Sequence, residues 1–581
     1  MRNDVVFLHP PAVFDFRKRA IFPGPIDNTL PNCTPQFIVP PIGMVSIAEY
    51  LMRNGAKVRI FNLGELMMNS PSFELEDFLK GNYARIYAID LHWCNHSQGA
   101  IEVAKLCKRI HSDSFVVLGG LTATCFSTEI LQKFPFVDAV VRGEGEIPML
   151  KLLNSLELRK IEQVHNLTFR KDKRIMVNPM SPPVSNLDEY EFAMPELLEP
   201  GNLSTRGVSP DGKVVRWWGI PICRGCAYSC HHCGGSSLSY ETLLSREKLA
   251  FRSPSKLVED LRKLSEKGFK SVFLFQDPRM GGASYYKSLF KELKEAKLDI
   301  DLGMELFIPA GKDYLEELKS IKIPINLSIS PESAVEEVRI PHGRNYSNES
   351  LLKTIDLCRD LQIKLGIFFM VGLGKDTPES IKQTLLFCEM LYFKDREKRF
   401  NKEERLFQGP LWFKPEMALL ILLDPGSFGF NFPEQAGYNL IFKSFEDYYK
   451  GLSLPSWHQW ISYETKYMNK DMLVDWGLYA LERLFYLQEK YSLYERGEDR
   501  ALLNYERFKL RVNRAIIPLI DEIVKIKEEK EREERLFLLK DILDECLKGK
   551  VPDRSESFKP TERFYRESIG QIMKQIGGFI S

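Results

Sequence analysis

The chain has 581 residues, 44% of them hydrophobic, and its 80 lysines and arginines nearly balance 79 aspartates and glutamates, which leaves a net charge of +1. This length exceeds what one hydrophobic core supports and predicts several domains. The balanced charge argues against a nucleic-acid-binding protein. The 11 cysteines do not indicate a disulfide framework in so long a chain, and four of them lie within eleven positions. Such a cluster is typical of a metal site in a reducing compartment.

We expect a cytoplasmic protein without an integral membrane segment. No apolar run reaches the ~18–20 residues that a membrane-spanning helix needs. The first residues, MRNDVVFLHPP, are too short an apolar stretch for a signal peptide and are soon interrupted by prolines.

Residues 1–150 alternate short apolar runs with stretches of helical periodicity, which predicts a doubly wound, Rossmann-like parallel sheet with helices on both faces. Ligands of such sheets bind at the carboxyl ends of the strands. The expected strands are Val5–Pro11, Lys57–Gly64, Ala84–Trp93, Phe115–Gly120 and Asp138–Glu146.

The rest of the chain divides into three further parts. Residues 151–210 contain six prolines and no long period, which indicates a connector. Residues 211–424 hold a second series of strands and helices that predicts a partial (β/α)6, TIM-like barrel with its chemistry at the C-terminal rim. Its six expected strands begin with VVRWWGIPI and end with Glu416–Leu423. Residues 425–581 predict a mainly helical domain.

The stretch CRGCAYSCHHCGG follows the first expected barrel strand directly. Zinc sites usually take two ligand pairs that are ~12 or more residues apart, and this spacing is much shorter. An iron–sulfur cluster fits better, because Cys226, Cys230 and Cys233 form C-x3-C-x2-C and leave one iron open. Cys223 remains an alternative fourth ligand, which would close the cluster for electron transfer.

This motif, placed after a strand that opens a (β/α)6 series, resembles the radical SAM superfamily. The resemblance implies a [4Fe–4S] cluster on the three cysteines and S-adenosylmethionine on its open iron. It also implies that His232 meets adenine through its backbone, although a loop histidine facing solvent is the simpler interpretation. The other residues that the resemblance assigns to S-adenosylmethionine lie at expected strand ends: Gln276, Asp277, Ser330, Glu332 and Gly372.

The N-terminal strand ends LGGLTATCF and VVRGEGE resemble the cobalamin-binding domain that precedes many radical SAM barrels. Asp90-Leu91-His92 copies the D-x-H of cobalt-ligating domains, but the glycine of D-x-H-x-x-G is missing. His92 is therefore either a cobalt-facing side chain or a partly buried strand-end histidine, and a sheet that no longer binds cobalamin is a further alternative. The residues that the resemblance assigns to cobalamin are Pro10, Asn62, His92, Gly119, Gly120, Thr122, Gly143 and Glu144.

The resemblance implies an enzyme in which a 5′-deoxyadenosyl radical abstracts hydrogen from an unactivated carbon and methylcobalamin then supplies a methyl group. The substrate is expected to be a small molecule or a lipid, and the reductant a ferredoxin or flavodoxin. Three alternatives stay open: ring or carbon–carbon bond formation without methyl transfer, a non-enzymatic electron carrier or cobalamin sensor, and a tRNA methylthiotransferase. The last would use a second cysteine trio near the N-terminus and a basic RNA module, which the C-terminal residues do not resemble.

Overall fold

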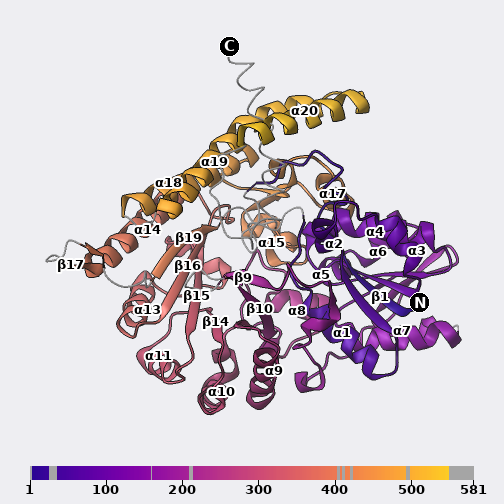
Figure 1. Ribbon diagram of the computed structural model, residues 1–581, viewed down its shortest axis with the longest axis horizontal. Coiled ribbons are helices and arrows are strands. Elements are labelled where there is room, and N and C mark those ends of the chain that lie inside the picture. Colours follow the sequence, from indigo (N-terminus) through magenta and orange to yellow (C-terminus); the bar gives the residue numbers. More distant parts are fainter. Residues whose placement is uncertain are drawn as a thin grey trace.

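The computed structural model describes residues 3–24, 36–158, 160–208, 214–401, 406–407, 413–418, 423–491 and 497–547. Two large sheets, each accompanied by helices, occupy the two halves of the molecule, and long C-terminal helices run along one side (Figure 1).

The first sheet has the strand order β7-β6-β5-β4-β3-β1-β2-β8. Its five central strands are parallel and match the five expected from the sequence. They are β1 (Asn3–His9), β2 (Val58–Asn62), β3 (Ala84–Asp90), β4 (Phe115–Gly119) and β5 (Ala139–Val141). The direction of winding changes between β1 and β3, so this pair marks the switch point where doubly wound sheets bind ligands.

Helices cover both faces of this sheet, which explains why its strands are almost continuously apolar. The helices are α1 (Ile42–Arg53), α2 (Leu63–Asn69), α3 (Leu75–Gly81), α4 (Ser97–Ile110), α5 (Leu121–Cys125), α6 (Ser127–Lys133) and α7 (Glu146–Leu158).

The segment expected to be a connector extends the first sheet at both edges. Strands β6 (Leu167–Lys171) and β7 (Arg174–Val177) form an antiparallel hairpin beside β5, and β8 (Leu198–Glu199) pairs with β2. The hairpin turns at Asp172, which has a positive φ of 52°. Such short strands give a weak sequence pattern, because β6 is buried at three consecutive residues and β7 is largely exposed, so neither alternates clearly.

The second sheet has the order β19-β16-β15-β14-β13-β10-β9, and all neighbours from β10 to β19 are parallel. This is the partial barrel of six parallel strands that the sequence predicts. The strands are β9 (Arg206–Val208), β10 (Val214–Pro221), β13 (Ser271–Phe275), β14 (Asp301–Leu306), β15 (Ile325–Glu332), β16 (Lys364–Met370) and β19 (Phe413–Ala418). The last strand begins three residues earlier than expected, and residues 419–422 lie outside the described ones.

In β13, β14 and β16 the side chains of one face are buried beneath the outer helices, and those of the other face are half-buried. In β14 the side chains of Leu302, Met304 and Leu306 are buried, whereas Gly303 and Glu305 are half-buried. The covering helices are α9 (Pro254–Glu266), α10 (Gly282–Ala296), α11 (Lys312–Lys319), α13 (Asn348–Asp360) and α14 (Pro378–Arg399). The half-buried face is therefore the concave side of the barrel, which remains accessible for a ligand.

The C-terminal part is mainly helical, as predicted. It contains α15 (Phe428–Asn431), α17 (Phe445–Gly451), α18 (Lys470–Lys490), α19 (Gly497–Val524) and α20 (Glu529–Leu547). A small apolar cluster joins Ala20 and Phe22, near the N-terminus, to α19 and α20. Among the described residues, no helix is both long and apolar enough to span a bilayer.

Candidate active site

The cysteine loop follows the carboxyl end of β10, as the sequence predicts. The thiols of Cys226, Cys230 and Cys233 lie close enough to influence one another electrostatically. The backbone N–H groups of Tyr228 and Gly235 donate to the Sγ atoms of Cys226 and Cys233 at 3.4 and 3.3 Å. Such N–H···S contacts are a feature of iron–sulfur ligation. Burial raises the pKa of Cys230 to about 11, and the nearby Arg344 guanidinium opposes that shift.

Cys223 lies apart from this trio in its bonding. It belongs to the short strand β11 (Cys223–Arg224), which pairs with β12 (Ala250–Phe251). Its Sγ is 3.6 Å from Gln276 Oε1 and 3.8 Å from the Gly225 carbonyl oxygen. The Cys223 thiol thus contacts Gln276 at the end of the second barrel strand, β13. This contact favours a cluster that is held by three cysteines and has one open iron.

A histidine pair and a glycine support the loop from the β15 side. His232 Nδ1 is 2.9 Å from His342 Nδ1, and His342 is buried. The His232 ring is therefore packed rather than facing solvent. Gly343 has φ +72°, and a Cβ there would lie 2.9 Å from Cys230 Sγ. Only glycine fits that approach.

The segment after the barrel fastens the loop from another side. Asp424 Oδ2 accepts the Gly234 N–H at 2.9 Å, and the Gly429 N–H donates to the His231 carbonyl at 2.7 Å. These residues were not predicted as site residues. Contacts through backbone groups leave no motif in the sequence, so only the Asp424 side chain offered any signal.

The two polar residues at the end of β13 are engaged by protein groups. Gln276 accepts the Cys223 N–H at 3.3 Å and donates to the Gly225 carbonyl at 3.4 Å. Asp277 is buried, pairs with Arg279 and accepts the Phe307 N–H at 3.0 Å. Both side chains shape the strand end, and their assignment to S-adenosylmethionine stays a prediction.

Glu332, at the end of β15, is the predicted residue with free bonding capacity. It is buried, and its Oε1 accepts from Arg344 at 3.2 Å. Its Oε2 is buried and has no partner. Burial raises the pKa of Glu332 to about 7, although Arg344 acts to lower it. The Ser330 carbonyl accepts from Arg344 Nε at 2.8 Å, so Arg344, which was not predicted, ties this strand end together.

Gly372 follows β16 with φ +93°, and its N–H donates to Asp376 Oδ2 at 3.2 Å. Asp376 is buried and is surrounded by hydrogen-bond donors without a cation, and burial raises its pKa to about 7. The turn predicted to contact S-adenosylmethionine is thus held by the Asp376 carboxyl group.

At the first sheet, the predicted strand ends are bonded to one another. Asp90 Oδ1 accepts the His92 N–H at 3.0 Å, and the His92 carbonyl accepts from the Thr122 hydroxyl at 3.0 Å. A Cβ on Gly120 would lie 2.4 Å from His92 Cα, so this glycine allows the two loops to touch. The His92 ring is half-buried.

The remaining predicted cobalamin residues occupy the same edge. Asn62 caps α2 by accepting the Glu65 N–H at 3.1 Å and donates to the Ile38 carbonyl at 3.0 Å. The Gly143 N–H donates to the Thr124 hydroxyl at 3.0 Å. Pro10 is buried, and Gly119 is half-buried with no atom closer than 3.8 Å to an added Cβ.

Glu144 connects this edge to the cysteine loop. Its Oε1 accepts from Arg246 Nε at 2.8 Å, and Arg224 Nη1 lies 3.5 Å from its Oε2. Glu146, fully buried, accepts from Arg224 and from the Ser46 hydroxyl, the latter at 2.6 Å. Burial alone would raise the pKa of Glu146, but Arg224 lowers it. We call these four charged residues the interdomain clamp.

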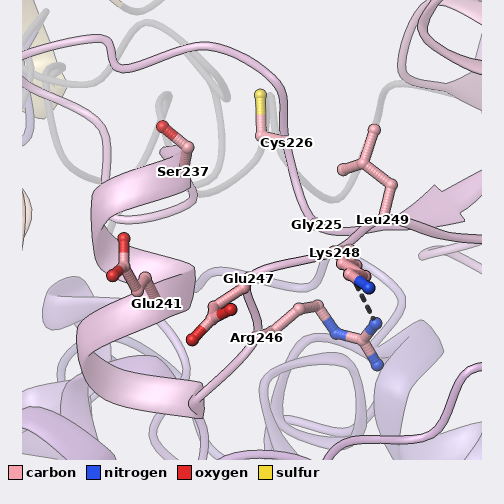
Figure 2. Close-up of a pocket in the computed structure, with 8 residues that line it drawn as sticks. All are labelled: Gly225, Cys226, Ser237, Glu241, Arg246, Glu247, Lys248 and Leu249. Carbon is pink, nitrogen blue, oxygen red and sulfur yellow. Dashed lines mark hydrogen bonds between the residues drawn. The ribbon is translucent and has the colours of Figure 1, made fainter.

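A cavity of about 260 Å³ lies beside the clamp (Figure 2). Cys226 lines one part of it and α8 (Ser237–Leu244) another, with Arg246 opposite. A second cavity of about 490 Å³ shares Arg246 and extends along residues 180–185. Two cavities therefore lie along the outer side of the cysteine loop.

Comparison with known proteins identifies both domains. The model of the radical SAM superfamily matches residues 220–388, and the model of the B12 binding domain matches residues 32–153. Residues 220–388 therefore match a radical SAM domain, and a match to a B12-binding domain lies ahead of it. The matched superfamily is one of enzymes, as the sequence predicts, and the two domains agree with the expected [4Fe–4S] cluster, S-adenosylmethionine and cobalamin.

Two curated relatives are similar over part of their length. The anaerobic magnesium-protoporphyrin IX monomethyl ester cyclase of Rubrivivax gelatinosus is 24% identical over 372 residues, which cover 59% of this chain and 61% of that one. An uncharacterized methyltransferase of Pyrococcus horikoshii is 24% identical over 294 residues, which cover 50% and 61%. The chain thus spans about 61% of the length of each.

Two solved structures share the fold. The radical S-adenosylmethionine methyltransferase TsrM from Kitasatospora setae, with cobalamin and a [4Fe–4S] cluster bound, has a TM-score of 0.56 at 13% identity and covers 90% of this chain and 100% of its own. The cobalamin-dependent S-adenosylmethionine radical enzyme OxsB has a TM-score of 0.55 at 14% identity and covers 99% and 77%. The expected order of Rossmann-like sheet, partial barrel and helical C-terminal part is confirmed.

Proposed function

We propose that this enzyme methylates an unactivated carbon of a small molecule or lipid. The observation that carries the proposal is the interdomain clamp. Arg224 stands between Cys223 and Cys226, and both carboxylates that hold it belong to the β5 end of the B12-binding domain. The clamp therefore fixes the ligand edge of the first sheet against the cysteine loop of the second.

The residues at both edges fit the cofactors. Cys226, Cys230 and Cys233 would hold the cluster, because their thiols are close together and already accept backbone N–H groups. The unpartnered Glu332 Oε2 would accept a ribose hydroxyl, and the Gly372 turn would face adenine. When bound, these cofactors supply a 5′-deoxyadenosyl radical that abstracts hydrogen and a methyl group that replaces it.

The chain's own part is to orient the substrate and exclude water. The concave barrel face carries Phe273, Phe275 and Phe368, each half-buried. A Cβ on Gly219 or Gly303 would lie 2.3 or 2.5 Å from one of these rings, so glycines in the neighbouring strands make room for them. An aromatic lining of this kind favours an apolar substrate.

Ring or carbon–carbon bond formation without methyl transfer is the second candidate. The same aromatic lining supports it, and the Rubrivivax gelatinosus relative is named as a cyclase. In either case the electron would come from a ferredoxin or flavodoxin, for which the cavity beside Cys226 offers an approach to the cluster.

The test is anaerobic reconstitution of the full chain with iron, sulfide and hydroxocobalamin, followed by dithionite and S-adenosylmethionine. We expect about four irons and one corrin per chain and formation of 5′-deoxyadenosine. Cys230→Ala removes a proposed ligand and abolishes that product. Cys358→Ala is the matched control, because Cys358 is a buried cysteine on α13 outside the loop.

The outcomes separate the candidates. Retained corrin and transfer of labelled methyl groups to a substrate support methylation. Formation of 5′-deoxyadenosine with no labelled methyl in any product shifts the assignment to ring or carbon–carbon bond formation. Equal activity of Cys230→Ala and Cys358→Ala contradicts the cluster assignment.

A further inference from the structure

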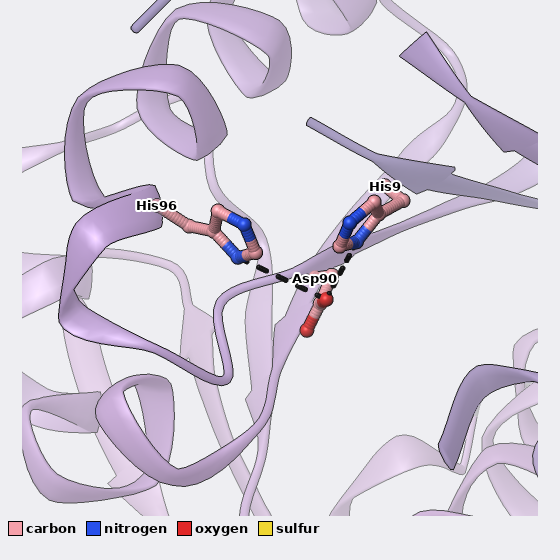
Figure 3. A group of neighbouring side chains, drawn as sticks. All are labelled: His9, Asp90 and His96. Carbon is pink, nitrogen blue, oxygen red and sulfur yellow. Dashed lines mark hydrogen bonds and ion pairs between the residues drawn. The ribbon is translucent and has the colours of Figure 1, made fainter. Parts of the chain in front are cut away.

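Three buried or nearly buried polar side chains meet at the switch point of the first sheet (Figure 3). His9 ends β1, Asp90 ends β3, and His96 lies in the short 3-10 turn Cys94–His96 that leads into α4. His9 Nδ1 is 2.8 Å from Asp90 Oδ2, and His96 Nδ1 is 3.9 Å from the same oxygen. One donor atom of each residue lies within 4.8 Å of the other two.

His9 is held through both nitrogens of its ring. Its Nε2 is 3.1 Å from the Phe37 carbonyl oxygen, which can only accept, so Nε2 donates a hydrogen there. Nδ1, on the other side of the ring, lies 2.8 Å from a carboxylate oxygen of Asp90 and faces the other two side chains of the group. An N–H donated to a backbone carbonyl is also how metal-ligating histidines are usually held.

His96 is the second observation and does not depend on His9. Its side chain is fully buried, and neither ring nitrogen has a hydrogen-bond partner. The Phe37 ring covers it edge-on, with centroids 4.3 Å apart, so water is kept from that side. A buried imidazole without partners costs free energy, and Figure 3 shows its ring turned toward Asp90.

We propose that His9, Asp90 and His96 bind one divalent transition-metal ion, with zinc as the ion to test first. Two imidazoles and one carboxylate are a donor set that suits zinc or iron(II), and three protein ligands leave a coordination position open. The ion would give His96 its missing partner and would be shared with His9 and Asp90. This inference does not rest on the proposed function, because the site uses none of the cysteines.

The ion would also join the ends of β1 and β3 to the start of α4. The neighbouring loop is built on Asp90, whose other oxygen accepts the His92 N–H. Metal at this site would therefore stiffen the edge on which the B12-binding domain presents its predicted ligand residues, without being part of the cysteine cluster.

The experiment uses the full chain with its cluster reconstituted, so that the loop cysteines are occupied. The protein is stripped with a mild chelator, exposed to zinc and desalted, and zinc is measured by elemental analysis and zinc K-edge absorption. We expect about one zinc per chain with a nitrogen/oxygen shell at ~2.0–2.2 Å and no sulfur at ~2.3 Å. Asp90→Asn and His96→Gln should each reduce zinc affinity at least tenfold.

His111→Gln is the matched control, because His111 lies at the end of α4 in the same domain and bonds a carbonyl, Leu79, at 2.9 Å. It should keep the zinc, and zinc should raise the melting temperature of this control and of the wild type but not of His96→Gln. A sulfur shell in the wild-type spectrum would overturn the proposal, and this outcome does not depend on any variant folding. Equal zinc content in the wild type, Asp90→Asn and His96→Gln would overturn it as well.

Discussion

The buried acids at the carboxyl edges of the two sheets have pKa values that are shifted in opposite directions. At the first sheet Glu144 and Glu146 face arginines, and the pKa of Glu146 is lowered. At the barrel, burial raises the pKa of both Glu332 and Asp376 to about 7. The first edge therefore carries fixed charge that joins domains, whereas the second keeps two acids that are close to neutral, of which Glu332 has an oxygen without a partner.

This difference indicates how each edge meets its cofactor. The loops of the first edge form hydrogen bonds with one another through Asp90, His92 and Thr122. A ligand there would therefore be held mainly by backbone groups and by the fit of its shape. The second edge presents the free Glu332 Oε2 and three thiols, so its ligand would be held by side chains. Four substitutions test this contrast.

Arg224→Met should have the largest effect, because it leaves Glu146 buried without its cation. Breaking a buried ion pair from one side costs about 3–5 kcal/mol. We expect the free energy of unfolding, measured in urea, to fall by that amount. Lys80→Met, which removes an exposed pair with Asp77, is the control and should leave the stability unchanged.

The double variant Arg224→Met/Glu146→Gln sharpens this prediction. It removes both charges, so much of the lost stability should return. If the double variant is as unstable as the sum of the two single variants, the pair is not coupled and the clamp does not hold the domains together.

Asp376→Asn should change how stability depends on pH. The folded pKa of about 7 lies above the value of 3.8 for the free side chain, so folding takes up a proton between these values. Stability contributed by the neutral acid is thus present at low pH and is lost as the pH rises from about 4 to about 7. The asparagine resembles the neutral acid, and at pH 8 the variant should be more stable by up to about 4 kcal/mol. We would measure the free energy of unfolding of both proteins at pH 5 and pH 8. If the difference between the variant and the wild type is the same at both pH values, the raised pKa of Asp376 is contradicted.

The fold was predictable to a large extent because its signals are local. Alternating strands and helices predict both sheets, and Ser253 caps α9 by accepting the Lys256 N–H, as its position before Pro254 indicates. The contacts that assemble the site are different. Arg224, Arg344 and Asp424 act on residues 78, 12 and 190 positions away, and no sequence period records such pairs. Gln276 and Asp277 were placed at the correct strand end, but their bonding could not be read from the sequence.

Glu332→Gln tests the free acceptor at the barrel edge. Gln keeps the shape but replaces one carboxylate oxygen by an N–H donor, so at pH 8, above the Glu332 pKa of about 7, a ribose hydroxyl loses a charged acceptor worth about 1.5–3 kcal/mol. We expect S-adenosylmethionine to bind about 10–100-fold more weakly in equilibrium dialysis, while cluster iron content is kept. Ser328→Ala, a half-buried change earlier on β15, is the control. Unchanged affinity in Glu332→Gln would remove this residue from the proposed site.

Glu129→Gln should have the smallest effect on stability. It tests how the C-terminal part is attached to the first domain. Glu129, on α6, accepts the N–H groups of Phe445 and Glu446 at 3.0 and 3.1 Å, and thereby satisfies the start of α17. Because a carboxylate at a helix N-terminus also interacts with the helix dipole, its loss should cost about 1 kcal/mol in urea unfolding. Glu162→Gln removes an exposed carboxylate, in the turn before β6, that pairs with Lys171 at the end of β6, and it should cost nothing measurable. If both variants behave alike, the Glu129 carboxylate does not contribute measurably to holding α17, whose contacts with the first domain also include the rings of Phe126 and Phe134.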